Sequence, residues 1–194
     1  DEEIQNCPLV SVDRHLNGIV PFVSSDNYDS TKMAIEYLIS TGAKKIGYLG
    51  TKPYVESEVN LREKAYLDVL KEHNLPTYCM NDIVDHGEEE KLVDKFLKTY
   101  EDLDSVFISG ITLTQIFYSK IKKIGKKVPE EMQIIGYDGL FNPWDSGIKI
   151  SSIQQPIKEL ADGAFELLID SINGKKVQRK NIYQAKFIKG ETTR

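Results

Sequence analysis

The 194-residue sequence lacks the short motifs by which catalytic and cofactor-binding sites are usually identified. It has no GxxxxGK[ST] phosphate loop and no GxGxxG after a predicted strand, so nucleotides and dinucleotide cofactors have no recognisable binding loop. It also has no GxSxG nucleophile elbow and no HExxH zinc motif. We therefore expect a protein that is not an enzyme and uses no cofactor.

Cysteine and histidine are scarce, with two and three residues respectively. Cys7 and Cys79 are far apart in sequence and neither belongs to a CxxC pair, which is typical of a reducing compartment, although one disulfide stays an alternative. His15, His73 and His86 show no metal-ligand spacing. The sequence therefore predicts no metal site.

Long apolar runs and an excess of positive charge are absent as well. No apolar run approaches the roughly 20 residues that span a bilayer, so we expect no membrane association. The 25 basic residues are outnumbered by 30 acidic ones, which gives a net charge of −5. A DNA-binding surface must neutralise phosphates, so this chain by itself is a poor candidate for binding nucleic acid.

The sequence does contain a repeated alternation of short apolar segments and amphipathic helices. The predicted helices cover residues 26–41, 57–73, 88–98, 112–123 and 158–172. The predicted strands cover residues 9–12, 22–23, 46–50, 83–84, 105–108, 133–137, 150–153 and 182–188. This alternation predicts an α/β fold whose sheets are mainly parallel and flanked by helices.

Four polar residues near predicted strand ends or helix starts are candidates for binding a small ligand, because ligands bind beyond the carboxyl ends of parallel strands. In Asp29 and Asp138 a carboxylate could accept hydrogen bonds from sugar hydroxyls, and the planar guanidinium of Arg62 could donate to two oxygens at once. Ser109 offers a hydroxyl. Each also has a simpler interpretation as a helix cap, a surface ion pair or a turn residue. Aromatic rings that could cover a sugar lie nearby in the sequence: Tyr54, Tyr137 and Trp144.

Five short segments occur in a fixed order along nearly the whole chain. They are residues 8–14 (PLVSVDR), 23–27 (VSSDN), 42–50 (GAKKIGYLG), 128–139 (VPEEMQIIGYDG) and 151–156 (SSIQQP). Arg62 and Tyr66 lie on a helix between them. The combination resembles the lactose-repressor/galactose-repressor (LacI/GalR) family. The chain departs from the family pattern at Ser109, where Asn is common, and at Gly139, where a second Asp is common, so the resemblance does not identify the ligand.

The resemblance implies a two-lobed fold of the periplasmic-binding-protein type I kind, with an effector site between the lobes. Effector contacts are implied for Arg62, Asp138, Asp29 and Ser109. Residues 1–50 with 153–176 are expected to form the first lobe, and residues 51–152 with 177–194 the second. Crossovers are expected at residues 51–53 and 142–144. Because family members begin with a helix-turn-helix head and two further strand–helix units, we expect this chain to lack the head and its first lobe to be incomplete.

The implied function is effector sensing in a cytoplasmic, bacterial, DNA-binding transcriptional regulator. The implied partners are a sugar or sugar phosphate, operator DNA through the missing head, and a second copy of the chain. The implied dimer contacts are Thr112, Gln115, Ile116, Asn142 and Trp144. A periplasmic or lipoprotein sugar-binding protein of a transport system shares the two-lobed fold and stays the alternative.

Overall fold

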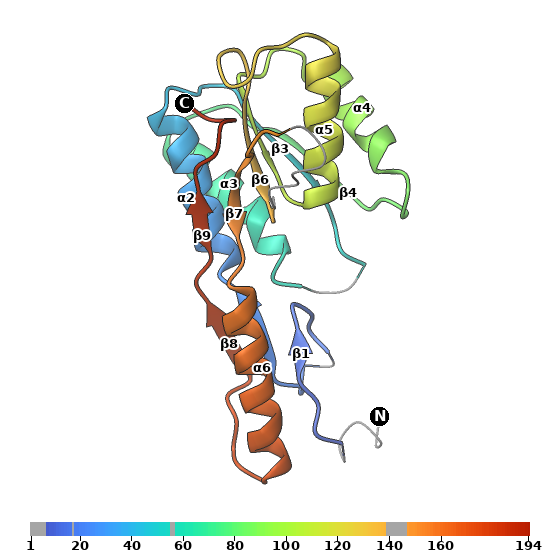
Figure 1. The fold of residues 1–194 in the computed structure, drawn as a ribbon, viewed down its shortest axis with the longest axis vertical. Coiled ribbons are helices and arrows are strands. Elements are labelled where there is room, and N and C mark those ends of the chain that lie inside the picture. Colours follow the sequence, from blue (N-terminus) through green and yellow to red (C-terminus); the bar gives the residue numbers. More distant parts are fainter. Residues whose placement is uncertain (1–6, 17, 55–56, 139–146) are drawn as a thin grey trace.

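The computed structural model describes residues 7–16, 18–54, 57–138 and 147–194. Figure 1 shows an elongated molecule in which a small sheet lies at one end and a larger sheet at the other. The helices within the described ranges are α2 (Asn27–Ser40), α3 (Asn60–Glu72), α4 (Glu89–Thr99), α5 (Ile111–Lys123) and α6 (Ile157–Ile172).

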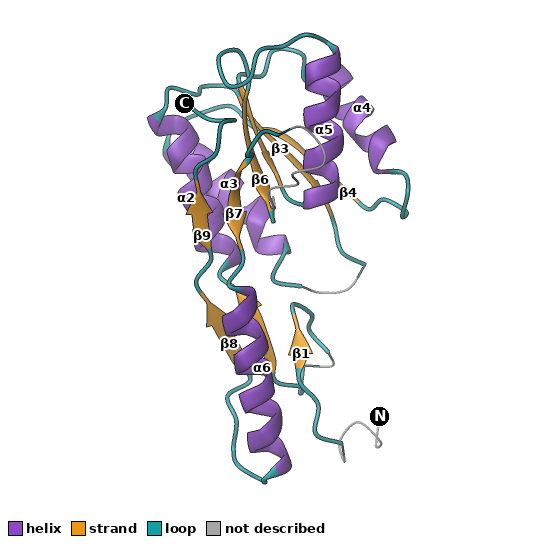
Figure 2. Ribbon diagram, viewed as in Figure 1, coloured by secondary structure: helices purple, strands orange, loops and turns teal. Residues whose placement is uncertain are grey.

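The small sheet has the strand order β1-β2-β8 and is parallel throughout. Its strands are β1 (Ser11–Val12), β2 (Phe22–Ser25) and β8 (Lys180–Tyr183). Helix α6 packs on it, mainly against β2 (Figure 2). We call this sheet and α6 the small lobe. On α6, only Leu160 and Gly163 are buried, whereas Phe165 is 65% exposed.

The larger sheet has the order β4-β3-β5-β6-β7-β9, and only β9 is antiparallel to its neighbour. Its strands are β3 (Ile46–Thr51), β4 (Tyr78–Asp82), β5 (Ser105–Ile108), β6 (Gln133–Tyr137), β7 (Ser151–Gln154) and β9 (Lys186–Ile188). We call this sheet and helices α2 to α5 the large lobe.

Helices cover both faces of the larger sheet, which explains why its central strands are continuously apolar. One core joins residues of α2 and α3, such as Leu38 and Tyr66, to Phe107 of β5. The other joins residues of α4 and α5, such as Phe96 and Phe117, to the opposite face. All four side chains named from the helices are fully buried. The expected α/β architecture with helix-flanked parallel sheets is confirmed.

Three connections join the lobes: from β2 to α2, from β7 to α6 and from β8 to β9. In Figure 1 they run side by side through the narrow waist of the molecule. The expected crossover at residues 51–53 is wrong, because that segment leads from β3 to α3 within the large lobe. The other expected crossover, residues 142–144, lies outside the described residues.

Four segments lie in a different part of the fold, or at a different position, than expected. Residues 46–50, expected in the first lobe, pair with β4 and β5 in the larger sheet. Helix α2, also expected there, packs chiefly against α3 of the large lobe. The single strand expected at residues 182–188 is two strands, of which β8 belongs to the small sheet and β9 to the larger one. The strand expected at residues 83–84 lies earlier, at β4, and Ile83 is 59% exposed.

Candidate functional site between the lobes

Strands β5, β6 and β7 end beside one another at the edge of the large sheet that faces the small lobe. Ser109 follows β5, Asp138 follows β6 and Gln155 lies just beyond β7. The chain passes from β7 directly to α6 of the small lobe, so this edge is the one at the junction of the lobes. In parallel sheets, such carboxyl-terminal edges are where ligands bind.

Arg62, in the first turn of α3, places a buried positive charge at this edge. Its side chain donates from Nε to Oδ1 of Asn27 at 2.6 Å and from Nη1 to the carbonyl of Ser109 at 3.1 Å. The guanidinium carbon lies 3.3 Å from the centre of the Tyr137 ring, a close cation–π contact. Within the described residues these contacts use two of the five N–H donors of the guanidinium, which leaves donors for a ligand.

Asp138 supplies a carboxylate next to this arginine. Its backbone is in the left-handed region, with φ of 58°. Its two carboxylate oxygens accept from Nε2 of Gln155 at 3.0 and 2.8 Å, and the amide oxygen of Gln155 accepts from the Ser25 hydroxyl at 2.7 Å. Burial raises the pKa of Asp138, while the Gln155 hydrogen bond and the charge of Arg62 oppose this shift. The carboxylate is therefore fixed in place and partly desolvated.

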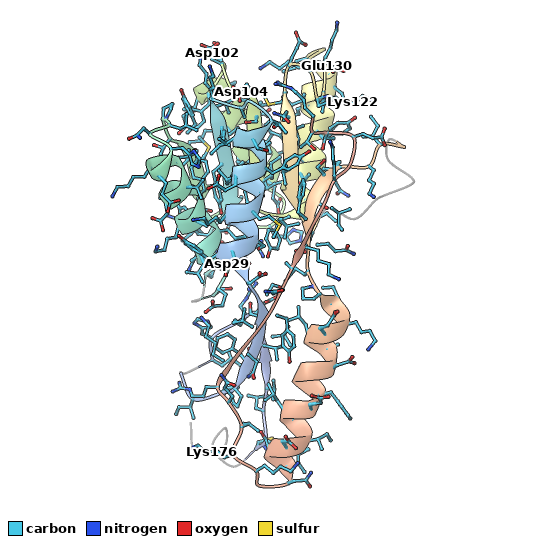
Figure 3. The ribbon with its side chains drawn as sticks, turned by 90° about the vertical axis from the view of Figure 1, so that its left-hand side faces the viewer. Asp29, Asp102, Asp104, Lys122, Glu130 and Lys176 are labelled. Carbon is cyan, nitrogen blue, oxygen red and sulfur yellow. The ribbon has the colours of Figure 1, made fainter. Side chains whose placement is uncertain are left out.

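Ser109 and Asp29 are placed very differently. The hydroxyl oxygen of Ser109 is buried and makes no hydrogen bond of standard geometry within the described residues, although the Tyr48 side chain lies close enough to interact with it. Asp29 is exposed in the first turn of α2, where its charge suits the helix dipole. Figure 3 places it at the end of α2 nearer the small lobe. No hydrogen bond or ion pair joins it to Arg62 or Asp138 within the described part of the chain. The structure thus brings three of the four predicted residues together, and Asp29 is not part of that group.

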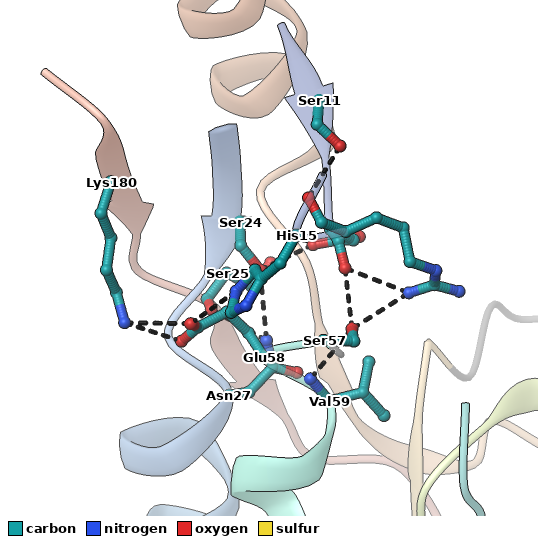
Figure 4. Close-up of polar contacts among 11 residues, drawn as sticks. Ser11, His15, Ser24, Ser25, Asn27, Ser57, Glu58, Val59 and Lys180 are labelled. Carbon is teal, nitrogen blue, oxygen red and sulfur yellow. Dashed lines mark hydrogen bonds and ion pairs between the residues drawn. The ribbon is translucent and has the colours of Figure 1, made fainter. Parts of the chain in front are cut away.

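The small lobe contributes residues to which the sequence reasoning gave no role. Asp13, just after β1, accepts a 2.7 Å hydrogen bond from Ser24, whose hydroxyl oxygen lies 3.4 Å from Nδ2 of Asn27. Asn27 in turn accepts from Arg62. Figure 4 shows the part of this network around Ser24 and Asn27. A continuous chain of polar contacts therefore runs from β1 across the junction to α3.

The arrangement places fixed donors and acceptors around one junction. The described residues contain no group of three or more histidine, cysteine or acidic side chains that could hold a metal. None of the helices in the described ranges combines the length and apolar character needed to cross a bilayer. Alternating donors and acceptors on rigid strand ends suit a small molecule that carries several hydroxyls.

Comparison with known sequences identifies relatives along most of the chain. The ribose operon repressor of Halalkalibacterium halodurans is 27% identical over 173 residues, which cover 88% of this chain and 51% of that protein. The sucrose operon repressor of Streptococcus mutans is 26% identical over 193 residues, 99% of this chain and 59% of that protein. The chain therefore spans just over half the length of these curated relatives.

Solved structures share the fold. A periplasmic binding protein/LacI transcriptional regulator from Alkaliphilus metalliredigens, complexed with D-xylulofuranose, matches with a TM-score of 0.86 and 29% identity over 97% of this chain and 71% of that one. A LacI family regulator from Enterococcus faecium with bound ribose matches with a TM-score of 0.83 and 22% identity over 98% and 72% of the two chains. The profile of the periplasmic binding protein-like domain matches residues 35–193. The expected two-lobed fold and the resemblance to LacI/GalR regulators are thereby confirmed, and the chain belongs to the periplasmic binding protein-like domain family.

Proposed function

We propose that this chain is the effector-binding part of a bacterial transcription regulator, and that it binds a sugar at the junction of its lobes. The observation that carries the proposal is the convergence of Arg62, Asp138 and Ser109. Guanidinium donors that no described residue uses, a fixed carboxylate and a buried hydroxyl lie at one edge of the large sheet. A sugar can satisfy all three, because each of its hydroxyls both donates and accepts.

The comparisons favour a regulator over a transport protein. Relatives that match nearly the whole chain are named as ribose and sucrose operon repressors. Two similar structures hold a pentose, D-xylulofuranose in one and ribose in the other. A transport-associated binding protein has the same fold, so the alternative is distinguished by whether the full-length protein binds operator DNA.

The proposed mechanism is a ligand-dependent change in the angle between the lobes. A sugar that binds one lobe arrangement more tightly shifts the population toward it. The three crossovers are the segments that would bend. Operator DNA would be bound by the part of the full-length protein outside the matched half, and its affinity for DNA would change with the lobe angle.

We further propose that the regulator is a homodimer in which α5 contributes to the contact. Thr112 is exposed on α5, and Gln115 and Ile116 are half-buried one turn further on, so the three share a face. Asn142 and Trp144, the other expected contacts, lie outside the described residues. Sedimentation of the T112R/Q115R double variant tests this interface, and an unchanged dimer mass would contradict it.

Titration calorimetry with D-ribose, D-xylulose and sucrose tests the sugar site. Arg62→Lys keeps the charge but removes the planar fork, so we expect at least about tenfold weaker binding, or about 1.4 kcal/mol. The matched control is Lys64→Met, because Lys64 lies on the same helix with its side chain 61% exposed. Unchanged affinity in the Arg62 variant would place the sugar elsewhere.

A further inference from the structure

A buried carboxylate at the start of α3 connects the lobes. Glu58 is only 6% exposed, and its side-chain partners within the described residues come from the small lobe. Nε2 of His15, in the segment after β1, lies 3.0 Å from its carboxylate. Nζ of Lys180, the first residue of β8, lies 3.0 Å from each carboxylate oxygen (Figure 4).

The same turn of chain has a second attachment to the small lobe. The hydroxyl of Ser57 donates to the backbone carbonyl of Asp13 at 2.7 Å and accepts from Nη1 of Arg14 at 3.1 Å. Within the described residues, the titratable side chains that contact this turn are therefore His15, Lys180 and Arg14. All of them belong to the small lobe, whereas Glu58 leads into a helix of the large lobe.

The turn that carries Glu58 is connected to Arg62 by backbone hydrogen bonds. The backbone N–H groups of Leu61 and Arg62 donate to the carbonyls of Glu58 and Val59 at 3.0 and 3.1 Å. Arg62 thus lies one turn beyond Glu58. A buried carboxylate that loses its partners raises the free energy of the folded protein. When the small lobe moves, Glu58 must therefore either follow His15 and Lys180 or lose its contacts with them. A movement of the small lobe must therefore shift Arg62 or break these contacts.

We propose that Glu58 is a positioning residue that couples the orientation of the small lobe to the placement of Arg62. The inference rests on the proposed sugar site, because it assigns to Glu58 the transmission of sugar binding to the small lobe. Sugar held by Arg62 favours the arrangement in which Glu58 contacts His15 and Lys180. The contacts of Glu58 with His15 and Lys180 thereby make the orientation of the small lobe depend on whether the sugar site is occupied.

The test compares Glu58→Gln and Lys180→Met with a matched control, Glu72→Gln. Glu72 lies at the other end of α3, its side chain is 55% exposed, and it pairs with Lys32 within the large lobe. Hydrogen exchange without ligand is followed in residues 57–62 and in β8, and D-ribose, D-xylulose and sucrose are titrated into each protein. Exchange reports coupling between the lobes even if none of these sugars binds.

We expect both variants to speed exchange in residues 57–62 and in β8 together, and the control to change neither. For any sugar that binds the wild type, we expect the two variants to weaken affinity by about tenfold, within the usual range of coupling between sites. Faster exchange in the turn alone, or unchanged affinity, would overturn the proposal. If the wild type binds none of the sugars, the proposed function fails, and exchange in β8 still decides whether Glu58 couples the lobes.

Discussion

The carboxylate of Asp138 is held in surroundings that disfavour its charged form. Burial raises its pKa above the ordinary value of 3.8, and the nearby Asp13 adds to the shift. The folded protein therefore binds a proton more tightly here than the unfolded chain does. Stability consequently falls as the pH rises from the ordinary value through the raised one. We interpret this cost as the consequence of keeping an ionised acceptor ready for a ligand.

Replacing Asp138 by Asn separates stability from binding. Asparagine can still accept from Gln155 but has no charge to desolvate, so we expect the free energy of unfolding at neutral pH to be unchanged or about 1 kcal/mol higher. Any gain should disappear well below pH 3.8, where the wild-type carboxyl is protonated in both the folded and the unfolded state. Sugar affinity should fall about tenfold. Urea unfolding at the two pH values and calorimetry measure these effects; a large loss of stability at neutral pH would contradict the argument.

Removing the hydroxyl group of Ser109 provides a second, simpler test of the proposed sugar site. Because its buried oxygen makes no hydrogen bond of standard geometry within the described residues and interacts only with the Tyr48 side chain, Ser109→Ala should change stability by less than about 1 kcal/mol, while sugar affinity falls several-fold. Ser105→Ala, at the start of the strand that precedes Ser109, is the matched control, since the buried Ser105 hydroxyl donates to Asp104 at 3.0 Å. The control should lose stability. Equal losses in both variants would mean that the Ser109 hydroxyl is satisfied in the free protein.

Residues at strand ends could be predicted from the sequence, whereas their hydrogen-bond partners could not. Arg62, Ser109 and Asp138 could be predicted because a strand, a turn and a helix are local patterns. Gln155 was noticed only within a motif, and its contact with the Ser25 hydroxyl could not be predicted, since Ser25 is 130 positions away in the sequence. Asn27 was noticed only within a motif. The binding role of all these residues stays a prediction.

At the scale of elements, the Tyr183 side chain of β8 packs directly against Gly163 of α6. A Cβ atom at Gly163 would lie 1.9 Å from the hydroxyl oxygen of Tyr183 and 2.6 Å from its Cζ. The Tyr183 ring would have to turn away, or the helix and the strand would have to move apart. The absence of a side chain at Gly163 thus leaves room for the Tyr183 ring between α6 and the small sheet.

Gly163→Ala should therefore destabilise the small lobe, by about 1–3 kcal/mol as for other overpacked sites. Denaturant unfolding measures the loss. The double variant G163A/Y183A provides the control, because removing the ring makes room for the new methyl group. We expect the double variant to lose less than the sum of the two single losses. Strict additivity would show that the helix tolerates the methyl group at this position.

Elements with continuous apolar patterns were predicted well, and the exceptions have physical reasons. Strand β4 was displaced because it ends in Asn81 and Asp82, which reduce its apolar signal, and because it pairs only with β3. The final strand was expected as one because its apolar residues continue past the crossover. There the N–H of Ala185 donates to the carboxylate of Asp26 at 2.7 Å, a contact between two crossovers that no local pattern reveals.

At the scale of the whole molecule, two lobes share three crossovers and a network of buried polar contacts. The lobe boundaries could not be read from the order of strands alone, because the chain crosses between lobes three times and each lobe is assembled from distant segments. Polar side chains lie where these segments meet. A ligand that completes their hydrogen bonds would favour one relative orientation of the lobes over others.

The most direct test of the account is a crystal structure of the protein with whichever of D-ribose, D-xylulose and sucrose binds most tightly in the titrations. We expect sugar hydroxyls within hydrogen-bond distance of the Arg62 guanidinium, the Asp138 carboxylate and the Ser109 hydroxyl. A sugar bound instead in the open pocket of about 380 Å³ beside Tyr54 and Asp85, with Arg62 and Asp138 untouched, would contradict the central claim.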